Sequence, residues 1–391
     1  MTLASPTARA ARAISGATLV PTAHSARILD AVLMGLIVVR VSLPGTPFPV
    51  AQIGIAVLVI VGCFRRPTRS FVHAWWVPAA MLGLLAFLVI ETWLQGIDPV
   101  RRAGNLAILI VMSLFLASGR IDVGSAVKGI GVGLLLNGAL FYAGVAPDNY
   151  QGRLTGFLED KNAGALVIAL GTFLLFLVIR SRWGRLLLVV AGAAAIAATD
   201  SRTTMAASFV ALVWLLSSRY LRRTAQLATL GMAFLAFLWA DDNLATIGDY
   251  GETREGSDEF RSRIDAASSL KAAAAPWHGF GLGEATVSLD SGTWFFHNAY
   301  EALIVEGGFV LAAVVLGLFV VAGLGLAPRA VGVDVTSGES RVITAATLVV
   351  FCCALRLGEV FLAPIGLVVL GIGIARMLPP LPSGQPASEH R

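Results

Sequence analysis

The stretch that decides the fold covers residues 241–308, and its second half contains 276-PWHGFGLG-283 and 294-WFFHNAYEALIVEGG-308. One apolar run ends at Trp239, just before this stretch, and another begins at His297. Between them the chain is polar or mixed, its longest departure from apolar sequence. A bilayer span needs about 20 mostly apolar residues. The segment is therefore predicted to be a large loop on one side of a membrane.

The composition indicates a membrane protein. The 391 residues are 57% hydrophobic and 14% charged, whereas a soluble domain is about half apolar and a quarter charged. The three cysteines lie in or at the ends of apolar runs without metal-type spacing, so we interpret them as core residues. The net charge of +5 is spread among loops, which argues against a nucleic-acid partner.

We predict an all-α, polytopic membrane protein with about 12 transmembrane helices. The expected spans lie near 28–43, 48–64, 71–94, 103–118, 125–144, 163–180, 186–199, 203–218, 224–240, 297–326, 341–357 and 360–377. The corresponding regions are a disordered cytoplasmic tail (1–27), spans one to nine (28–240), the large loop (241–296), spans ten to twelve (297–377) and a second disordered cytoplasmic tail (378–391).

The distribution of charge predicts the orientation. Short loops over 65–69, 180–182 and 219–223 are rich in arginine, and the positive-inside rule places such loops in the cytoplasm. Counting spans from these loops puts both termini inside. The segment 241–296 then lies on the outer face, where most of the acidic residues also fall.

Arginines recur at the predicted outer ends of the helices. Arg153, Arg202 and the pair Arg261/Arg263 all lie there. The planar guanidinium forms two parallel hydrogen bonds with phosphate oxygens, so several converging arginines can hold a pyrophosphate. The alternative is that each arginine only reaches the interface or pairs with a neighbouring acid, as Asp200 beside Arg202 suggests.

His297 begins the tenth predicted span, with Asn298 next to it and Glu301 one helical turn further on the same face. A histidine oriented by a carboxylate is a candidate general base toward a hydroxyl. The alternative is an interfacial histidine without a role. Glu306 lies deeper and is either functional or paired with a basic residue of another helix. Weaker candidates of the same kind are Arg40, Arg356 and Glu359.

The glycine run Gly279-x-Gly281-x-Gly283 has no strand–turn–helix context, so a dinucleotide site is rejected. A tight turn that returns the loop to the membrane explains it better. No cysteine–histidine cluster indicates zinc and no aspartate-rich loop indicates calcium, so no metal or cofactor is expected.

The spacing of these motifs resembles a known family. His297-Asn298 is followed after nine residues by Gly308, which is similar to the motif of the O-antigen ligases and the related O-antigen polymerases, bacterial glycosyltransferases of surface polysaccharide assembly. Further landmarks of the resemblance, within about residues 150–320, are Pro276–Gly281, Glu306-Gly307-Gly308, Arg153–Gly156 with Asn162, and Ser201-Arg202.

The resemblance implies a GT-C-like, twelve-span enzyme in the bacterial cytoplasmic (inner) membrane, with its active site on the outer face. Such enzymes move a glycan from an undecaprenyl-pyrophosphate carrier to an acceptor hydroxyl without a metal or cofactor. Carried over, His297 would be the general base or the group that positions the acceptor, and Arg202 with Arg261 or Arg263 would hold the pyrophosphate. Glu301 is counted with the catalytic residues, and Arg153, Asn298 and Glu306 are expected to contact substrate.

Two choices stay open at this stage. Leu311 stands where ligases often have a small residue or tyrosine, and the loop is short and alanine-rich, so a ligase and a polymerase are both possible. A transporter or flippase of lipid-linked sugars also explains twelve spans and basic outer sites. It does not explain a long outer loop that ends in a histidine motif. A structural membrane scaffold, the third alternative, requires His297 and the arginines to be dispensable.

Overall fold

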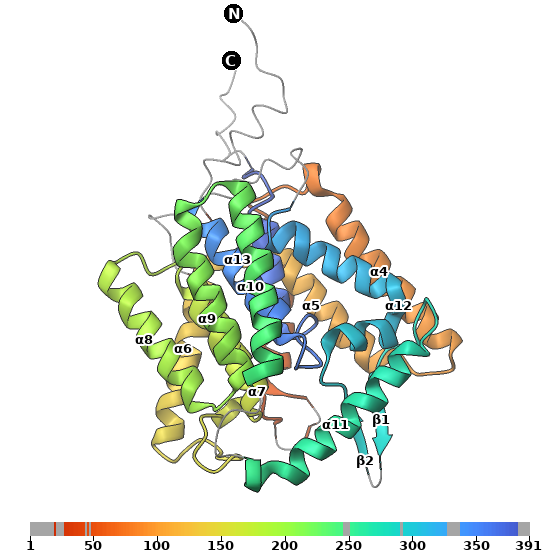
Figure 1. The fold of residues 1–391 in the computed structure, drawn as a ribbon. Coiled ribbons are helices and arrows are strands. Elements are labelled where there is room, and N and C mark those ends of the chain that lie inside the picture. Colours follow the sequence, from red (N-terminus) through yellow and green to blue (C-terminus); the bar gives the residue numbers. More distant parts are fainter. Residues whose placement is uncertain are drawn as a thin grey trace, which may run out of the picture.

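The computed structural model describes residues 19–20, 27–43, 45–46, 48–244, 251–289, 292–326 and 337–381, and in this part the protein is mostly helical (Figure 1). The helices are α2 (Ile28–Gly35), α3 (Val50–Cys63), α4 (Trp76–Leu94), α5 (Val100–Ser118), α6 (Val123–Tyr142), α7 (Lys161–Leu175), α8 (Arg182–Ala198), α9 (Arg202–Ser217), α10 (Arg223–Leu244), α11 (Gly251–Ala273), α12 (Ala299–Leu318), α13 (Gly338–Cys353) and α14 (Pro364–Ala375).

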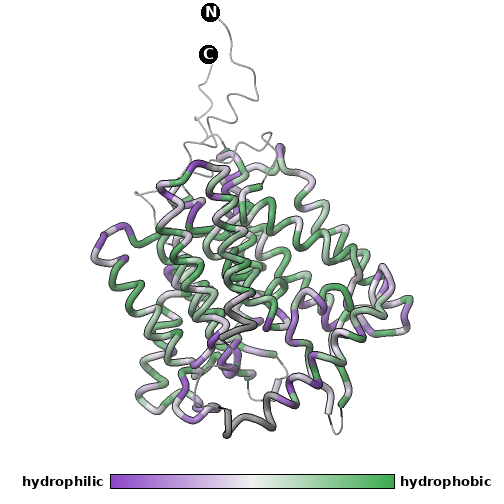
Figure 2. Tube along the Cα trace, viewed as in Figure 1, coloured by the Kyte–Doolittle hydropathy of each residue, from purple (hydrophilic) through white to green (hydrophobic). Residues whose placement is uncertain are grey.

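Every predicted span coincides with one of these helices, and α11 lies in the predicted loop. Among the described helices, four are long and apolar enough to cross a membrane by themselves: α4, α5, α6 and α12 with its π-helical extension to Gly323. The protein is thus a helical membrane protein, while the number of twelve spans stays a prediction. The tube in Figure 2 is mainly hydrophobic along the bundle and hydrophilic near the helix ends.

Close helix crossings depend on small residues. At the contact between α2 and α6, a Cβ on Gly129 would lie 1.9 Å from the carbonyl oxygen of Ala31. Small residues allow such backbone approach inside a membrane, where van der Waals packing replaces the hydrophobic effect. On the outside of the bundle, Leu135 and Leu187 are 73% and 69% exposed, as expected for side chains that face lipid.

Side-chain caps begin several of the helices. The carboxylate of Asp160 accepts hydrogen bonds from the backbone N–H groups of Asn162 and Ala163 at the start of α7. Asn298 does the same for Tyr300 and Glu301 at the start of α12. Such caps satisfy N–H groups that have no partner within the helix, so they fix where α7 and α12 begin.

The described part of the segment 241–296 contains regular secondary structure, and here the all-α prediction needs correction. Helix α10 extends into it as far as Leu244, and α11 occupies much of its middle. It also contains a two-stranded antiparallel hairpin, β1 (Thr286–Leu289) and β2 (Gly292–Phe295), with Thr286 opposite Phe295. A small separate core, which includes Ile264, Val287, Phe296, Ala302 and Val305, joins α11 and the hairpin to α12.

Helix α12 is broken at Gly307 and Gly308, whose backbone angles are not helical. The segment Trp277–Phe280 replaces the missing helical hydrogen bond. The N–H of Phe309 donates to the carbonyl of Trp277 (2.9 Å), and the carbonyl of Val305 accepts from the N–H of Phe280 (2.7 Å). The run that precedes α12 is thus inserted into the helix break, and both freed backbone groups are satisfied.

The break requires glycine. Gly308 has φ +64°, and a Cβ there would lie 1.9 Å from the carbonyl oxygen of Trp277. Gly279, with φ +87°, would place a Cβ 2.6 Å from the backbone nitrogen of Gly307. These contacts explain the glycine run that the sequence analysis interpreted as a tight turn. The run docks against a broken helix, so it is more than a reversal of the chain.

Candidate active site

His297 lies directly before the start of α12 and contacts α11. Its Nδ1 atom is 3.0 Å from Oδ1 of Asp265, and the two side chains are 29% and 36% exposed. A carboxylate at this distance accepts a hydrogen bond from Nδ1–H, which leaves Nε2 without the proton and able to accept one. The geometry is that of a general base with an orienting carboxylate.

The carboxylate beside His297 is Asp265, not Glu301. Glu301, one turn along α12, accepts a hydrogen bond from the hydroxyl of Ser269 (2.8 Å). Because Asp265 and Ser269 are four residues apart on α11, as His297 and Glu301 are along the chain, both contacts belong to one face of α11. Glu301 therefore helps to hold α11 against α12. Glu301 was expected to orient the histidine. This expectation is corrected, because Asp265 contacts the histidine and Glu301 contacts Ser269 of α11.

Asn298 is the N-cap of α12. Its side-chain oxygen accepts the hydrogen bonds described above, so that oxygen is occupied by the protein itself. The cap fixes the first turn of α12 and with it the position of the preceding histidine.

The two arginines in the middle of α11 differ in direction. Arg261 precedes Asp265 by one turn, so it lies on the face of α11 that meets His297. Arg263 lies two residues from Asp265 and faces away from it, and its guanidinium carbon is 6.0 Å from the ring centre of Phe260. Both arginine side chains are exposed. Helix geometry thus favours Arg261 as the arginine next to the histidine.

Arg153 contacts the turn that immediately precedes Arg202. A guanidinium nitrogen of Arg153 is 3.1 Å from Oδ2 of Asp200, and Nζ of Lys161 is 3.9 Å from the same oxygen. Asp200 lies in the turn between α8 and α9, and Arg202, exposed, is the first residue of α9. The structure therefore places two cations, Arg153 and Lys161, on a carboxylate that lies two residues before Arg202.

The end of α13 connects this turn to the histidine. Sγ of Cys353 is 3.9 Å from the hydroxyl oxygen of Thr204, in the first turn of α9. The carbonyl of the next residue, Ala354, accepts from the N–H of Ala299 at the start of α12 (2.7 Å). The first turns of α9 and α12 thus pack against the same end of α13, so Arg202 and the histidine belong to one end of the bundle.

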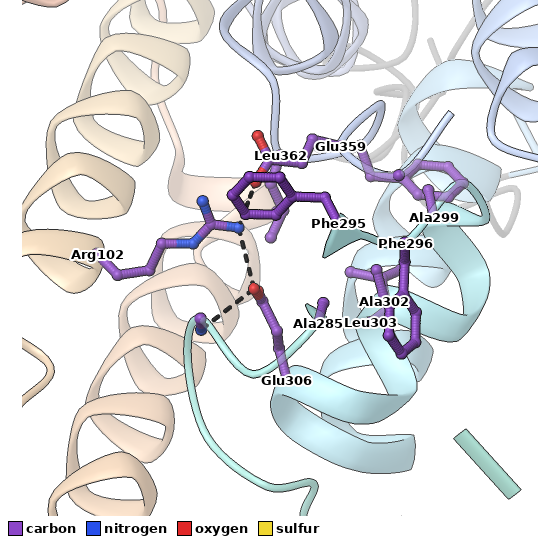
Figure 3. Close-up of a pocket in the computed structure, with 13 residues that line it drawn as sticks. Arg102, Ala285, Phe295, Phe296, Ala299, Ala302, Leu303, Glu306, Glu359 and Leu362 are labelled. Carbon is purple, nitrogen blue, oxygen red and sulfur yellow. Dashed lines mark hydrogen bonds and ion pairs between the residues drawn. The ribbon is translucent and has the colours of Figure 1, made fainter. Parts of the chain in front are cut away.

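Glu306 is 3% exposed and pairs with Arg102 of α5 (Figure 3). Nη2 of Arg102 is 3.0 Å from Oε1 of Glu306 and 2.7 Å from Oε1 of Glu359, which precedes α14. The same oxygen of Glu306 accepts from the N–H of Gly283 (3.2 Å). Of the two alternatives for Glu306, the structure supports pairing with a basic residue of another helix. The pair also lines a cavity.

Two important residues, Asp265 and Arg102, were missed from sequence. Asp265 had a signal, because it follows Arg261 by one turn in a segment with helical propensity. Arg102 had a weaker one, as half of an arginine pair at the start of an apolar run. Within the residues that the structure describes, no three His, Cys, Asp or Glu side chains come close enough to hold a metal ion.

The fold and the site together define a class: a helical membrane protein with a histidine–carboxylate pair and several arginines at one end of the bundle. Comparison with known proteins bears on the resemblance. Residues 187–316 match the family model described as O-antigen ligase, which confirms the resemblance to the O-antigen ligase and polymerase superfamily. The matched range contains Arg202, Asp265 and His297. No curated protein matches the chain.

The family match supports an O-antigen ligase- or polymerase-like membrane enzyme. It also implies a bacterial membrane and substrates that include a lipid-linked glycan and an acceptor.

Proposed function

We propose that this protein is an inverting, metal-independent glycosyltransferase that moves a glycan from an undecaprenyl-pyrophosphate carrier to an acceptor hydroxyl on the outer face of the cytoplasmic membrane. The observation that carries the proposal is the contact of His297 with Asp265 (3.0 Å) on the same face of α11 as Arg261. A base and an anion-binding cation next to each other are what a transfer from a pyrophosphate requires.

The histidine acts on the acceptor. Nε2 of His297 takes the proton of the acceptor hydroxyl as the oxygen attacks the anomeric carbon. Asp265 stays ionised, holds Nδ1–H and stabilises the imidazolium that forms. Attack from the side opposite the leaving group inverts the anomeric configuration. The new bond joins the acceptor oxygen to the anomeric carbon, and the broken bond joins that carbon to the carrier's phosphate oxygen.

The arginines act on the leaving group. The electron pair of the broken bond passes to the pyrophosphate, whose charge grows in the transition state. Arg261 and Arg202 are placed at the histidine's end of the bundle, where they can bind this charge. Cations that meet the developing charge stabilise the transition state more than the bound substrate. Arg153 has Asp200 as its partner, so its role is to position the turn that carries Arg202.

Reconstituted protein tests the proposal. Wild type, His297→Ala and His73→Ala are incorporated into liposomes and supplied with a purified undecaprenyl-pyrophosphate glycan, with and without acceptor. His73 is a matched control because it is exposed and lies away from the site, before α4. Wild type and His73→Ala are expected to transfer glycan, and His297→Ala to be slower by about 10²- to 10⁴-fold.

The outcomes separate the alternatives. Elongation with donor alone identifies a polymerase, and dependence on an added acceptor identifies a ligase. Equal turnover by wild type and His297→Ala removes the histidine from the mechanism. Movement of the lipid-linked glycan across the bilayer without any transfer identifies a transporter.

A further inference from the structure

A cavity of about 530 Å³ lies beside the candidate active site. Its wall includes parts of α3, α5 and α7, the end of β2 and the segment before α14. Phe296, the neighbour of His297, lines it. Gly358, also in the wall, packs so closely that a Cβ there would lie 1.9 Å from the carbonyl oxygen of Phe296. The cavity therefore shares a wall with the histidine, and its size is that of a small-molecule site.

Several polar side chains in this cavity have no protein partner. Within the described residues, the side chains of Arg40, Gln52, Asn105 and Glu159 make no hydrogen bond or ion pair. Gln52 and Asn105 are half-buried amides on α3 and α5. An amide offers two donors and one acceptor, and half-buried amides without protein partners are suited to a ligand that both donates and accepts.

Arg102 adds donors to the same cavity. Its two ion pairs, to Glu306 and Glu359, both use Nη2. Figure 3 shows the guanidinium between the two carboxylates, with a second nitrogen directed away from Glu306. Among the described residues, Nη1 and Nε of Arg102 have no partner, so their N–H groups are available to a ligand.

The charge of the lining disfavours an anion. The cavity has two arginines, Arg40 and Arg102, against four carboxylates, those of Glu159, Asp160, Glu306 and Glu359. Asp160 is already engaged, because it caps α7 and accepts from the hydroxyl of Tyr150 (2.9 Å). Burial and the Asp160 carboxylate raise the pKa of Tyr150 to about 12, so this hydroxyl stays protonated. A pyrophosphate would meet a surplus of negative charge here.

A hydroxylated, uncharged ligand fits this lining. Carboxylates and amides accept hydrogen bonds from hydroxyl groups, and the amides and Arg102 donate to ring and hydroxyl oxygens. Phe295 and Phe296 provide apolar surface for the C–H face of a sugar ring. We propose that this cavity is a saccharide subsite, which holds a sugar residue of the glycan donor or of the acceptor while the pyrophosphate lies outside it, with the arginines near His297.

This inference rests on the proposed function, and it predicts a separation of binding from chemistry. Loss of one subsite hydrogen bond weakens sugar binding without touching the reacting atoms. Gln52→Ala and Asn105→Ala are therefore expected to raise the KM of one substrate about 3- to 10-fold with kcat unchanged. Gln95→Ala is the matched control, since this exposed amide lies outside the cavity, 2.9 Å from Glu91.

The source of the sugar is decided by which KM rises. Donor is varied at fixed acceptor in one arm, and acceptor is varied at fixed donor in the other. A rise in the first arm assigns the subsite to the donor glycan, and a rise in the second assigns it to the acceptor. Equal KM values for Gln52→Ala, Asn105→Ala and Gln95→Ala in both arms overturn the subsite, because the cavity then binds neither sugar.

Cysteine protection gives a readout that does not depend on turnover. Asn105→Cys is introduced together with Cys63→Ala, which removes the exposed native thiol; the other two cysteines are buried. Labelling by N-ethylmaleimide is then measured with no addition, with undecaprenyl pyrophosphate, with the glycan-bearing donor and with acceptor glycan. The glycan-bearing donor or the acceptor is expected to slow labelling, and undecaprenyl pyrophosphate alone is not.

Equal protection by undecaprenyl pyrophosphate and by the glycan-bearing donor would show that the cavity holds the carrier, and would overturn the proposal. Absence of protection by all three compounds, in a protein that transfers glycan, would overturn it as well. In both cases the glycosyltransferase function stands. If wild type fails to transfer glycan under every condition, the proposed function falls, whatever the labelling shows.

Discussion

Two histidine–carboxylate pairs lie near α12, and they differ in their surroundings. His297 contacts Asp265 of α11 at 3.0 Å, and Nδ1 of His278 lies 2.7 Å from Oε1 of Glu91 of α4. The histidine side chains are similarly exposed, at 29% and 27%. His297 has Arg261 on the adjoining helical face. His278 belongs to the segment inserted into the break of α12, and its ring lies edge-on to Trp277.

The comparison shows that a histidine–carboxylate contact does not by itself define a base. His278 attaches an inserted segment to α4, next to the glycines that meet the helix break. His297 stands at a helix start beside a partly exposed carboxylate, Asp265, and Arg261 lies one helical turn before that carboxylate. Hydrogen-bond geometry and neighbours together distinguish the two histidines: Nδ1 of His297 is hydrogen-bonded to Asp265, whereas Nδ1 of His278 lies close to Glu91 without forming a hydrogen bond.

The largest effect on the stability of the broken helix and its inserted segment is expected from Gly308→Ala. The new Cβ would collide with the carbonyl of Trp277 and would force a side chain into positive φ. Strain and the lost backbone hydrogen bonds together cost about 2–4 kcal/mol. The melting temperature in detergent and glycan transfer should both fall, because the inserted segment with His278 can no longer dock.

Gly317→Ala is the control on the same helix, since its Cβ would have no neighbour within 4 Å. Its melting temperature is expected to match or exceed that of wild type. If the melting temperature of Gly308→Ala equals that of wild type, docking of the inserted segment does not depend on the break in α12.

Asp265→Asn tests the catalytic pair directly. The amide keeps the shape but loses the charge that stabilises the imidazolium. A hydrogen bond to a charged group contributes about 1.5–3 kcal/mol, so kcat should fall about 10- to 100-fold. The parallel change at the other pair, Glu91→Gln, should leave kcat within about twofold, because transfer does not pass through His278. Equal losses in the two variants would contradict the distinction between the pairs.

Hydropathy predicted the helices well, because a long apolar segment in lipid must satisfy its backbone hydrogen bonds within itself, and an α-helix does so. The hairpin over residues 286–295 was missed because strands of four residues carry almost no periodic signal. It is held by a small core shared with α11 and α12. A local sequence pattern does not indicate such contacts, because they form between segments that are far apart in the sequence.

The candidate site was predicted by residue type but not by partner. His297 and the arginines follow from chemistry and topology, whereas Asp265 lies 32 residues before the histidine and Arg102 lies 204 residues before Glu306. Sequence spacing cannot distinguish Asp265 from the other acids of the segment. Glu301 has the correct helical spacing from His297, so it was expected to orient the histidine. In the structure Asp265 of α11 is the carboxylate that contacts His297.

Arg261→Ala and Arg263→Ala sharpen the assignment of the pyrophosphate ligand. Arg261 lies on the face of α11 that carries Asp265. Its loss should reduce kcat/KM about tenfold, which corresponds to the lower end of the free-energy range of a charge-assisted hydrogen bond. Arg263 lies near Phe260, and its loss should change kcat/KM by less than about twofold. The measurement is transfer at subsaturating donor. The reverse order would assign the pyrophosphate to Arg263.

The smallest effect on chemistry is expected from His278→Ala. The substitution removes the contact with Glu91 but leaves the backbone hydrogen bonds of Trp277 and Phe280 to α12 in place. Stability should fall by about 0.2–1 kcal/mol, the contribution of a partly exposed ion pair, while kcat stays within about twofold of wild type. A lower melting temperature with unchanged kcat is the signature of an anchor. A loss of kcat as large as that of His297→Ala, in a protein that melts normally, would make His278 a second functional histidine and would end the distinction between the two pairs.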